Sequence, residues 1–180
     1  MFKKIKEIFS IKTPNHKDYS FPHEILYRKI LQTSYNNWFY KDLKVDDTIE
    51  GRFEIIVLHI FVLFKILDER NEENTIFKQK LLETFIEELD STYREIGISD
   101  NTFSKKMRIA AQSIYGRIDS YNTQFDNIDL FSESLQRNIW PLVEGKIKES
   151  KLLSNYVYDK IKKYNNKGYK DIIQKSSEEF

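Results

Sequence analysis

The stretch Asp47–Leu67, which reads DTIEGRFEIIVLHIFVLFKIL, decides the fold of this 180-residue chain. Asp47 is followed three positions later by Glu50, a spacing typical of a helix start, so we expect a helix from about Thr48. Apolar residues then fill two separate stripes at helical spacing. Because a helix that is apolar on two faces packs at the centre of a bundle, this segment predicts an all-α fold built around it.

Helical periodicity continues on both sides of this segment. We expect further helices over about 22–36, 74–96, 100–121, 130–139 and 152–164. Gly97 is expected to end the second of these in a left-handed conformation, with Ile98 folding back onto the last turn. No repeat and no second domain are evident. The sequence therefore predicts a single helical bundle of about six to eight helices.

We divide the chain into three parts. Residues 1–20 are expected to form a basic amphipathic arm and a linker, because the apolar residues of the arm share one side of a helix and its lysines lie elsewhere. Such an arm suits contact with an anionic membrane surface, and equally suits docking on its own domain. Residues 21–168 are expected to form the bundle and residues 169–180 a polar tail.

Composition restricts the possible classes of function. Apolar residues make up 40% and charged residues 32%, which suits a packed core with a soluble exterior. The formal net charge of +1 argues against binding of DNA through bulk positive charge. Cysteine is absent, which excludes disulfides, cysteine-ligated zinc and thiol nucleophiles. Only 5 glycines and 3 prolines occur, which favours long helices.

No segment resembles a secretory signal or a membrane span. The N-terminus lacks an apolar run followed by a small-residue cleavage site. The longest apolar stretch, residues 55–67, is interrupted by His59 and Lys65 and is shorter than the roughly 18–20 residues that cross a bilayer. We therefore expect a cytoplasmic protein in which this stretch is a buried core helix.

Catalytic and metal-binding patterns are missing. The sequence contains no H-x-x-E-H pair, no glycine-rich phosphate loop and no G-x-S-x-G elbow. His59 lies among apolar residues, where we expect a hydrogen-bonded core histidine. Glu50 and Glu54 stand one helical turn apart without an evident proton-relay partner. We predict that the protein is not an enzyme and that it uses no cofactor and no metal.

Two blocks of charged residues are candidates for a protein-binding surface. If the helices that carry them pack antiparallel, their charges meet at one end of the bundle. One interpretation is an internal salt-bridge network that fixes the loops. The other is a polar rim beside an apolar surface that receives a client protein. The residues concerned are Asp47, Arg52, Glu54, Asp90, Arg94 and Glu95.

A third block, within the helix expected after Asp100, adds Lys105, Lys106, Tyr115 and Arg117. The two lysines predict a basic exposed edge, which is either a binding feature or a solvated face. Tyr115 belongs with a group of aromatic residues that suits either an apolar peptide or the core. The other members of that group are Trp38, Phe39 and Tyr40.

Two glycines stand inside predicted helices, Gly51 and Gly116. A glycine there costs about 1 kcal/mol relative to alanine, so we expect close packing or a tight helix entry at Gly51 and a close approach of another backbone at Gly116. Arg117, next to Gly116, would then hold that neighbouring segment.

These blocks, in this order, resemble the ubiquinol–cytochrome c chaperone family, the assembly factors of the cytochrome bc1 complex. The pattern is D-T-x-x-G-R-F-E-x-x-x-L-H over residues 47–59, then D-x-x-x-R-E-x-G-x-x-D over 90–100, K-x-M over 105–107 and Y-G-R over 115–117. The similarity extends over about Phe21 to Tyr164. The chain departs from the pattern of the family at Asp46, Ile96 and Ser99.

The resemblance implies an all-α, non-enzymatic chaperone that binds cytochrome b, or another respiratory-complex subunit, before assembly. It also implies a second assembly factor and the ribosome as partners. Because the N-terminus does not resemble a transit peptide, we expect a bacterial member acting in the cytoplasm, with peripheral contact to the inner membrane.

Two other functions stay open. A helical adaptor could bind the ribosome, RNA or another membrane-protein client, with a basic footprint formed by Lys105, Lys106, Arg108 and Arg117. A small-molecule-binding or enzymatic helical domain would require a deep pocket lined by His59 and other polar groups.

Overall fold

The computed structural model describes residues 21–67, 69–141, 143, 145–165, 167–175 and 180. Over these residues the chain forms helices and no strand, which confirms the predicted all-α fold. The arm expected over residues 1–20 lies outside the described residues. The elements are α2 (Pro22–Ser34), a π-helical turn η1 (Trp38–Asp42), α3 (Ile49–Ile66), α4 (Glu72–Glu95), α5 (Asp100–Gln124), α6 (Ile128–Ile139), α7 (Ile147–Tyr164) and α8 (Tyr169–Lys175).

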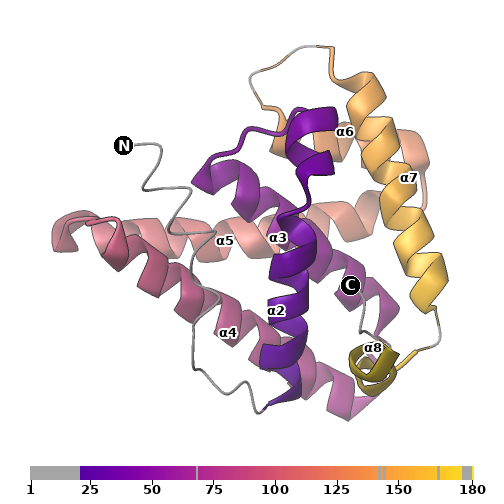
Figure 1. Cartoon of the computed structure of the whole chain (residues 1–180), viewed down its shortest axis with the longest axis horizontal. Helices are drawn as coiled ribbons and strands as arrows, with labels where there is room; N and C mark the ends of the chain where they lie inside the picture. Colours follow the sequence, from indigo (N-terminus) through magenta and orange to yellow (C-terminus); the bar gives the residue numbers. More distant parts are fainter. Residues whose placement is uncertain (1–20, 68, 142, 144, 166, 176–179) are drawn as a thin grey trace.

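Helix α3 is the centre of the bundle, as its two apolar faces predict. Figure 1 shows α3 passing through the middle of the molecule, with the α4–α5 pair extending to the left and α7 lying at the right. α3 contacts α2, α5, α6 and α7. Every residue from Ile55 to Leu63 is buried, because neighbours cover this helix on all sides.

The start of α3 differs in detail from the expectation. Thr48, and not Asp47, caps the helix: its hydroxyl oxygen accepts a hydrogen bond from the Gly51 amide at 3.1 Å. The Asp47 carboxylate instead binds Arg52. A threonine at this position satisfies an amide that has no partner within the helix, which leaves the aspartate available for an ion pair.

Gly97 ends α4 in the predicted left-handed conformation, with φ at +77°. The Gly97 amide donates to the Arg94 carbonyl at 3.0 Å, and the Ile98 amide donates to the Tyr93 carbonyl at 3.1 Å. This pair of hydrogen bonds is the Schellman motif, which satisfies carbonyls in the last turn of a helix. The tight reversal lets α5 return beside α3 and α4.

The two helical glycines have different surroundings. A Cβ atom added at Gly51 would lie 2.0 Å from the Asp46 carbonyl oxygen, so the expected close packing is confirmed there. A Cβ atom added at Gly116 would meet nothing within 4 Å. The expectation that another backbone passes close to Gly116 is therefore wrong, and Gly116 lies on the solvent side of α5.

The segment expected as a polar tail is partly structured. Residues Tyr169–Lys175 form α8, which contacts α2. The ring of Tyr169 stacks on Phe77 of α4 with centroids 4.2 Å apart, and Ile172 is buried. Their spacing of three places both on one helix face, and this apolar face is the reason that the segment packs on the bundle. None of the described helices is long and apolar enough to span a membrane.

Candidate functional site

Residues from the first and the third sequence block converge on a groove of about 320 Å³ between α3, α4 and α5, which we call the α3–α5 groove. Glu54, Lys106 and Arg117, all predicted site residues, line it together. The complete lining is Ile49, Glu50, Phe53, Glu54, Tyr93, Lys106, Ile109, Ala110, Ser113 and Arg117.

Helical spacing explains why these residues meet. The α5 contribution comes from positions 106, 109, 110, 113 and 117, which follow one side of a helix. The α3 contribution comes from its first turns, directly after the Thr48 cap. Tyr93 lies in the last turns of α4, before the Gly97 reversal. The groove is therefore formed by the first turns of α3, the last turns of α4 and one side of α5.

The floor of the groove is apolar, although its rim is charged. Phe53 is half-buried and its ring stacks on Phe85 with centroids 5.8 Å apart. Ile109 is 48% exposed, so its side chain adds accessible apolar surface to the groove. Glu50 and Lys106 are exposed at the rim. The arrangement suits contact with an apolar surface bordered by polar groups.

A buried ion pair joins α3 to α5 at this groove. The Arg117 Nε atom lies 2.5 Å from Glu54 Oε2, and the two side chains are 23% and 8% exposed. Burial raises the pKa of the Glu54 carboxyl, and the hydrogen bond and charge of Arg117 oppose that rise. Arg117 also lies over the Phe53 ring. For these two residues the structure favours the internal salt bridge over an exposed rim.

The remaining charges of the first two blocks are distributed around α3 and α4. Arg52 binds Asp47 at 2.7 Å, and its guanidinium lies over the ring of Tyr35. Positions 52 and 54 differ by about 200° around the helix axis, so Arg52 and Glu54 project to opposite sides of α3. Glu54 therefore lies apart from Arg52, while the proximity of Arg52 to the charges at the end of α4 stays a prediction.

At the end of α4, Arg94 binds Asp90 at 2.7 Å on the surface and lies over the ring of Phe103. Glu95, the neighbouring predicted residue, lines a separate small groove between α2 and α4. These three residues therefore belong to the α4 surface. Their role in binding stays a prediction.

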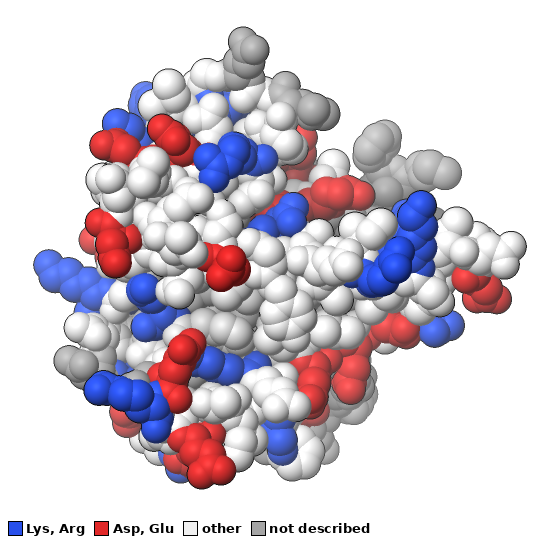
Figure 2. All heavy atoms as spheres, turned by 180° about the vertical axis from the view of Figure 1, so that it is seen from behind, with Lys and Arg blue, Asp and Glu red and all other residues white. Residues whose placement is uncertain are grey.

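The basic footprint expected on α5 is smaller than predicted. Lys105, Lys106 and Arg108 are exposed, whereas Arg117 is half-buried and bound to Glu54. Figure 2 shows positive and negative residues interspersed over the rear face of the molecule, with uncharged surface between them. Such a distribution lacks the single-sign stripe that nucleic-acid binding by bulk charge requires.

The aromatic residues predicted as a group are separated in the structure. Trp38 and Phe39 pack against Tyr156 with ring centroids 5.4 Å away in each case, so they belong to the core region around α7. Tyr115 is instead 59% exposed on α5. It lines a second groove of about 610 Å³ with Phe64 and Ile118.

His59 is a hydrogen-bonded core histidine, as predicted. It is 0% exposed, with Nε2 lying 2.8 Å from the Tyr156 hydroxyl and Nδ1 lying 2.7 Å from the Ile55 carbonyl oxygen. Burial lowers the pKa of His59 to about 3, against an ordinary value of 6.5, so the ring is neutral at physiological pH. The grooves lined by Phe53, by Glu95 and by Tyr115 do not include this ring among their residues.

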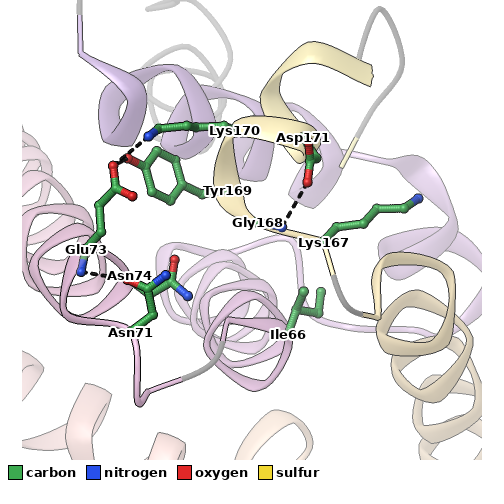
Figure 3. Close-up of a pocket in the computed structure, with 9 residues that line it drawn as sticks. All are labelled: Ile66, Asn71, Glu73, Asn74, Lys167, Gly168, Tyr169, Lys170 and Asp171. Atoms are coloured by element: carbon green, nitrogen blue, oxygen red, sulfur yellow. Dashed lines mark hydrogen bonds and ion pairs between the residues drawn. The ribbon is translucent and has the colours of Figure 1, made fainter.

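A polar pocket of about 460 Å³ lies between the start of α4 and α8 (Figure 3). Its charged groups bind one another: Glu73 accepts from Lys170 at 2.6 Å and from the Tyr169 hydroxyl at 2.9 Å. The Asp171 carboxylate accepts from the Gly168 amide at 3.2 Å. These contacts anchor α8 to α4 and form no convergent ligand set. Across the described part of the chain, no group of acidic or histidine side chains is arranged to hold a metal ion.

Sequence reasoning did not place Ile109 or Tyr93 at the site. Ile109 follows Lys105, Lys106 and Arg108, and the two lysines predicted only a basic exposed edge in this part of α5. The available signal was the spacing of four between Ile109, Ser113 and Arg117, which keeps the three residues within an arc of about 80° on α5.

Comparisons with known proteins agree with the motifs. Residues 41–178 match the family model described as Ubiquinol-cytochrome C chaperone. A comparison with curated proteins found no match. The structure is similar to the crystal structure of the Cbp3 homolog from Brucella abortus, with a TM-score of 0.75 and 24% identity over 97% of this chain and 92% of that chain, a likeness that shows the fold. The chain therefore belongs to the ubiquinol–cytochrome c chaperone family, whose members are assembly chaperones of the cytochrome bc1 complex.

Proposed function

We propose that this protein assists assembly of the ubiquinol–cytochrome c reductase by holding an apolar segment of the cytochrome b subunit in the α3–α5 groove. One observation carries the proposal: Phe53 and Glu54 from the first block of the family resemblance and Arg117 from the last block meet at a groove with an apolar floor. Ile109 supplies exposed apolar surface there, and Phe53 extends it toward α3.

The physical requirement comes from the client. A membrane-spanning helix of cytochrome b cannot remain exposed to water before insertion, because its apolar surface favours aggregation. A shallow groove with a charged rim binds such a segment and still releases it, since only part of the segment is buried. Glu50 and Lys106 supply the rim, while the Glu54–Arg117 pair holds α3 and α5 at the correct separation.

The proposal also concerns where the protein acts. Cytochrome b is inserted into the inner membrane, so we infer that this chaperone works in the bacterial cytoplasm in peripheral contact with that membrane. A second assembly factor and the ribosome are further proposed partners. The remaining predicted residues, including Asp47, Arg52, Asp90, Arg94 and Glu95, are candidates for contacts with such partners.

A matched pair of variants tests the proposal. Ile109→Asp places a charge in the groove, and Ile76→Asp places one at a 50% exposed isoleucine on α4, roughly 25 Å along the helix from Tyr93. We expect cytochrome b to co-purify from native membranes with the unmodified protein and with Ile76→Asp, but not with Ile109→Asp.

Cells that lack the gene should contain less assembled cytochrome b at an unchanged transcript level. Normal amounts of the assembled complex in those cells would contradict the proposal. Salt-sensitive pelleting with ribosomes that requires Lys105 and Lys106, without recovery of cytochrome b, would support the adaptor function instead.

A further inference from the structure

Phe180 is completely buried, at 0% exposure, although the segment before it was expected to be polar. Its ring stacks on Tyr164 of α7, with centroids 5.5 Å apart and ring planes inclined by 21°. The centroid of the His59 ring, from α3, lies 6.4 Å from that of Phe180, with the two ring planes inclined by 64°. Two helices therefore provide a flat slot that fits an aromatic ring.

The main chain of Phe180 is held as specifically as its ring. Its carbonyl oxygen accepts a hydrogen bond from the Thr33 hydroxyl of α2 at 2.8 Å, and a second from the Lys160 ammonium of α7. The same ammonium lies 5.8 Å from the centre of the Phe180 ring. We call the set Thr33, His59, Lys160 and Tyr164 the Phe180 socket.

The socket is built by rigid elements. Its members come from α2, α3 and α7. Hydrogen bonds to Ile55 and Tyr156 fix the His59 ring, so its edge is presented in one orientation. Thr33 and His59 are themselves buried. A hydroxyl, an ammonium and two rings thus converge on a volume that one phenylalanine residue fills.

Phe180 and α8 are attached to the bundle separately. The Lys29 ammonium donates to the Ile173 carbonyl at 3.2 Å, and Tyr169 stacks on Phe77, so α8 has anchors of its own. Phe180 is held by the contacts that its own ring and its own carbonyl oxygen make with the socket. Local opening of such an attachment requires much less free energy than unfolding of the bundle.

We propose that the Phe180 socket is a recognition site for an aromatic side chain together with its peptide carbonyl, and that Phe180 is its intramolecular occupant. A peptide segment carrying a phenylalanine displaces Phe180 by making the same contacts: ring on Tyr164 and His59, carbonyl oxygen on Thr33 and Lys160. This inference is independent of the α3–α5 groove, whose lining shares no residue with the Phe180 socket.

Ligand binding to the Phe180→Ala variant tests the proposal. The probe is N-acetyl-L-phenylalaninamide, which carries the ring and the carbonyl, and N-acetyl-L-leucinamide is the control. We expect the aromatic probe to shift the His59 ring resonances and to bind about five- to tenfold more tightly than the control. Adding Thr33→Val should weaken binding by removing one hydrogen-bond donor.

Equal affinity for the two probes, or no shift of the His59 resonances in folded Phe180→Ala, would overturn the proposal. If that variant does not fold, the unmodified chain supplies the test. A phenylalanine peptide should then displace Phe180 and accelerate amide exchange at Phe180, leaving Leu58 in the core unchanged. Unaltered exchange at saturating peptide would overturn the proposal as well.

Discussion

At the scale of single residues, the Glu54–Arg117 pair shows why the groove keeps its shape. Its two side chains are 63 residues apart in sequence and are largely removed from water. An ion in such a place is tolerated only while its partner is present, because desolvation otherwise makes the charge costly. The pair therefore fixes the distance between α3 and α5 more firmly than a surface salt bridge would.

Arg117→Leu should destabilise the protein by about 3–5 kcal/mol, because it leaves the Glu54 carboxylate buried without its counter-ion. The double variant Glu54→Leu, Arg117→Leu should recover much of that loss. Arg94→Leu removes an exposed pair and is the matched control, with no measurable change expected. Urea unfolding measures all three. If the Arg117→Leu protein were as stable as the unmodified one, the ion pair would make no contribution to stability.

The burial of His59 predicts that the free energy of unfolding depends on pH in a specific way. Its folded pKa of about 3 lies below its ordinary value of 6.5, so the unfolded chain binds more protons between these values. The contribution of neutral His59 to the stability of the folded protein is fully present above pH 6.5. It is lost progressively as the pH falls toward 3. The slope approaches about 1.4 kcal/mol per pH unit. His59→Gln should flatten the stability curve between pH 6 and 4, and an unchanged slope would contradict this assignment.

Gly51 and Gly116 should respond to alanine with opposite signs. Gly51→Ala places a Cβ atom against the Asp46 carbonyl and should cost about 1–3 kcal/mol. Gly116→Ala meets open space in an exposed helix and should stabilise the protein by about 0.5–1 kcal/mol. Thermal unfolding of the two variants compares them directly. Loss of stability in Gly116→Ala would mean that an unseen neighbour approaches α5.

At the scale of helices and turns, local chemistry made some boundaries predictable. The end of α4 follows from Gly97, and the start of α3 follows from the polar residues at 47–50, because caps depend on neighbours in sequence. Helix α8 was not predicted. Its burial depends on Phe77 and Lys29, which are distant in sequence, so local polarity gave the wrong answer.

Gly97→Val should destabilise the α4–α5 reversal by about 1–2 kcal/mol, since a β-branched residue fits poorly at a φ of +77°. Gly97→Asn is the control, because asparagine tolerates this conformation and should cost less. Amide exchange of the residues next to Gly97 measures the local loss of stability, and unfolding of the whole protein measures the global loss. Equal stability of the valine and glycine proteins would refute the Schellman assignment.

At the scale of the whole molecule, the motifs identified the family, but not which of the predicted residues lie together. Asp47, Arg52 and Glu54 are close in sequence, which suggested one cluster. The helix geometry instead sends Arg52 and Glu54 to opposite sides of α3, where each meets a different partner. The pairing of Glu54 with Arg117 depends on the angle at which α5 crosses α3. That angle cannot be deduced from a single sequence.

The same distinction applies to the aromatic residues. Trp38, Phe39 and Tyr115 look equivalent in sequence, yet the first two pack against α7 and the third faces solvent on α5. Composition predicts that aromatic residues will be mostly buried. It does not predict which of them remains at the surface for a partner.

The central claim is that the α3–α5 groove holds cytochrome b before assembly, and site-specific photo-cross-linking in living cells tests it most directly. A photoreactive residue at position 109 should form an adduct with cytochrome b that appears during synthesis and disappears on assembly. The same residue at position 76 should form none. A cytochrome b adduct from position 76 and none from position 109 would contradict the account.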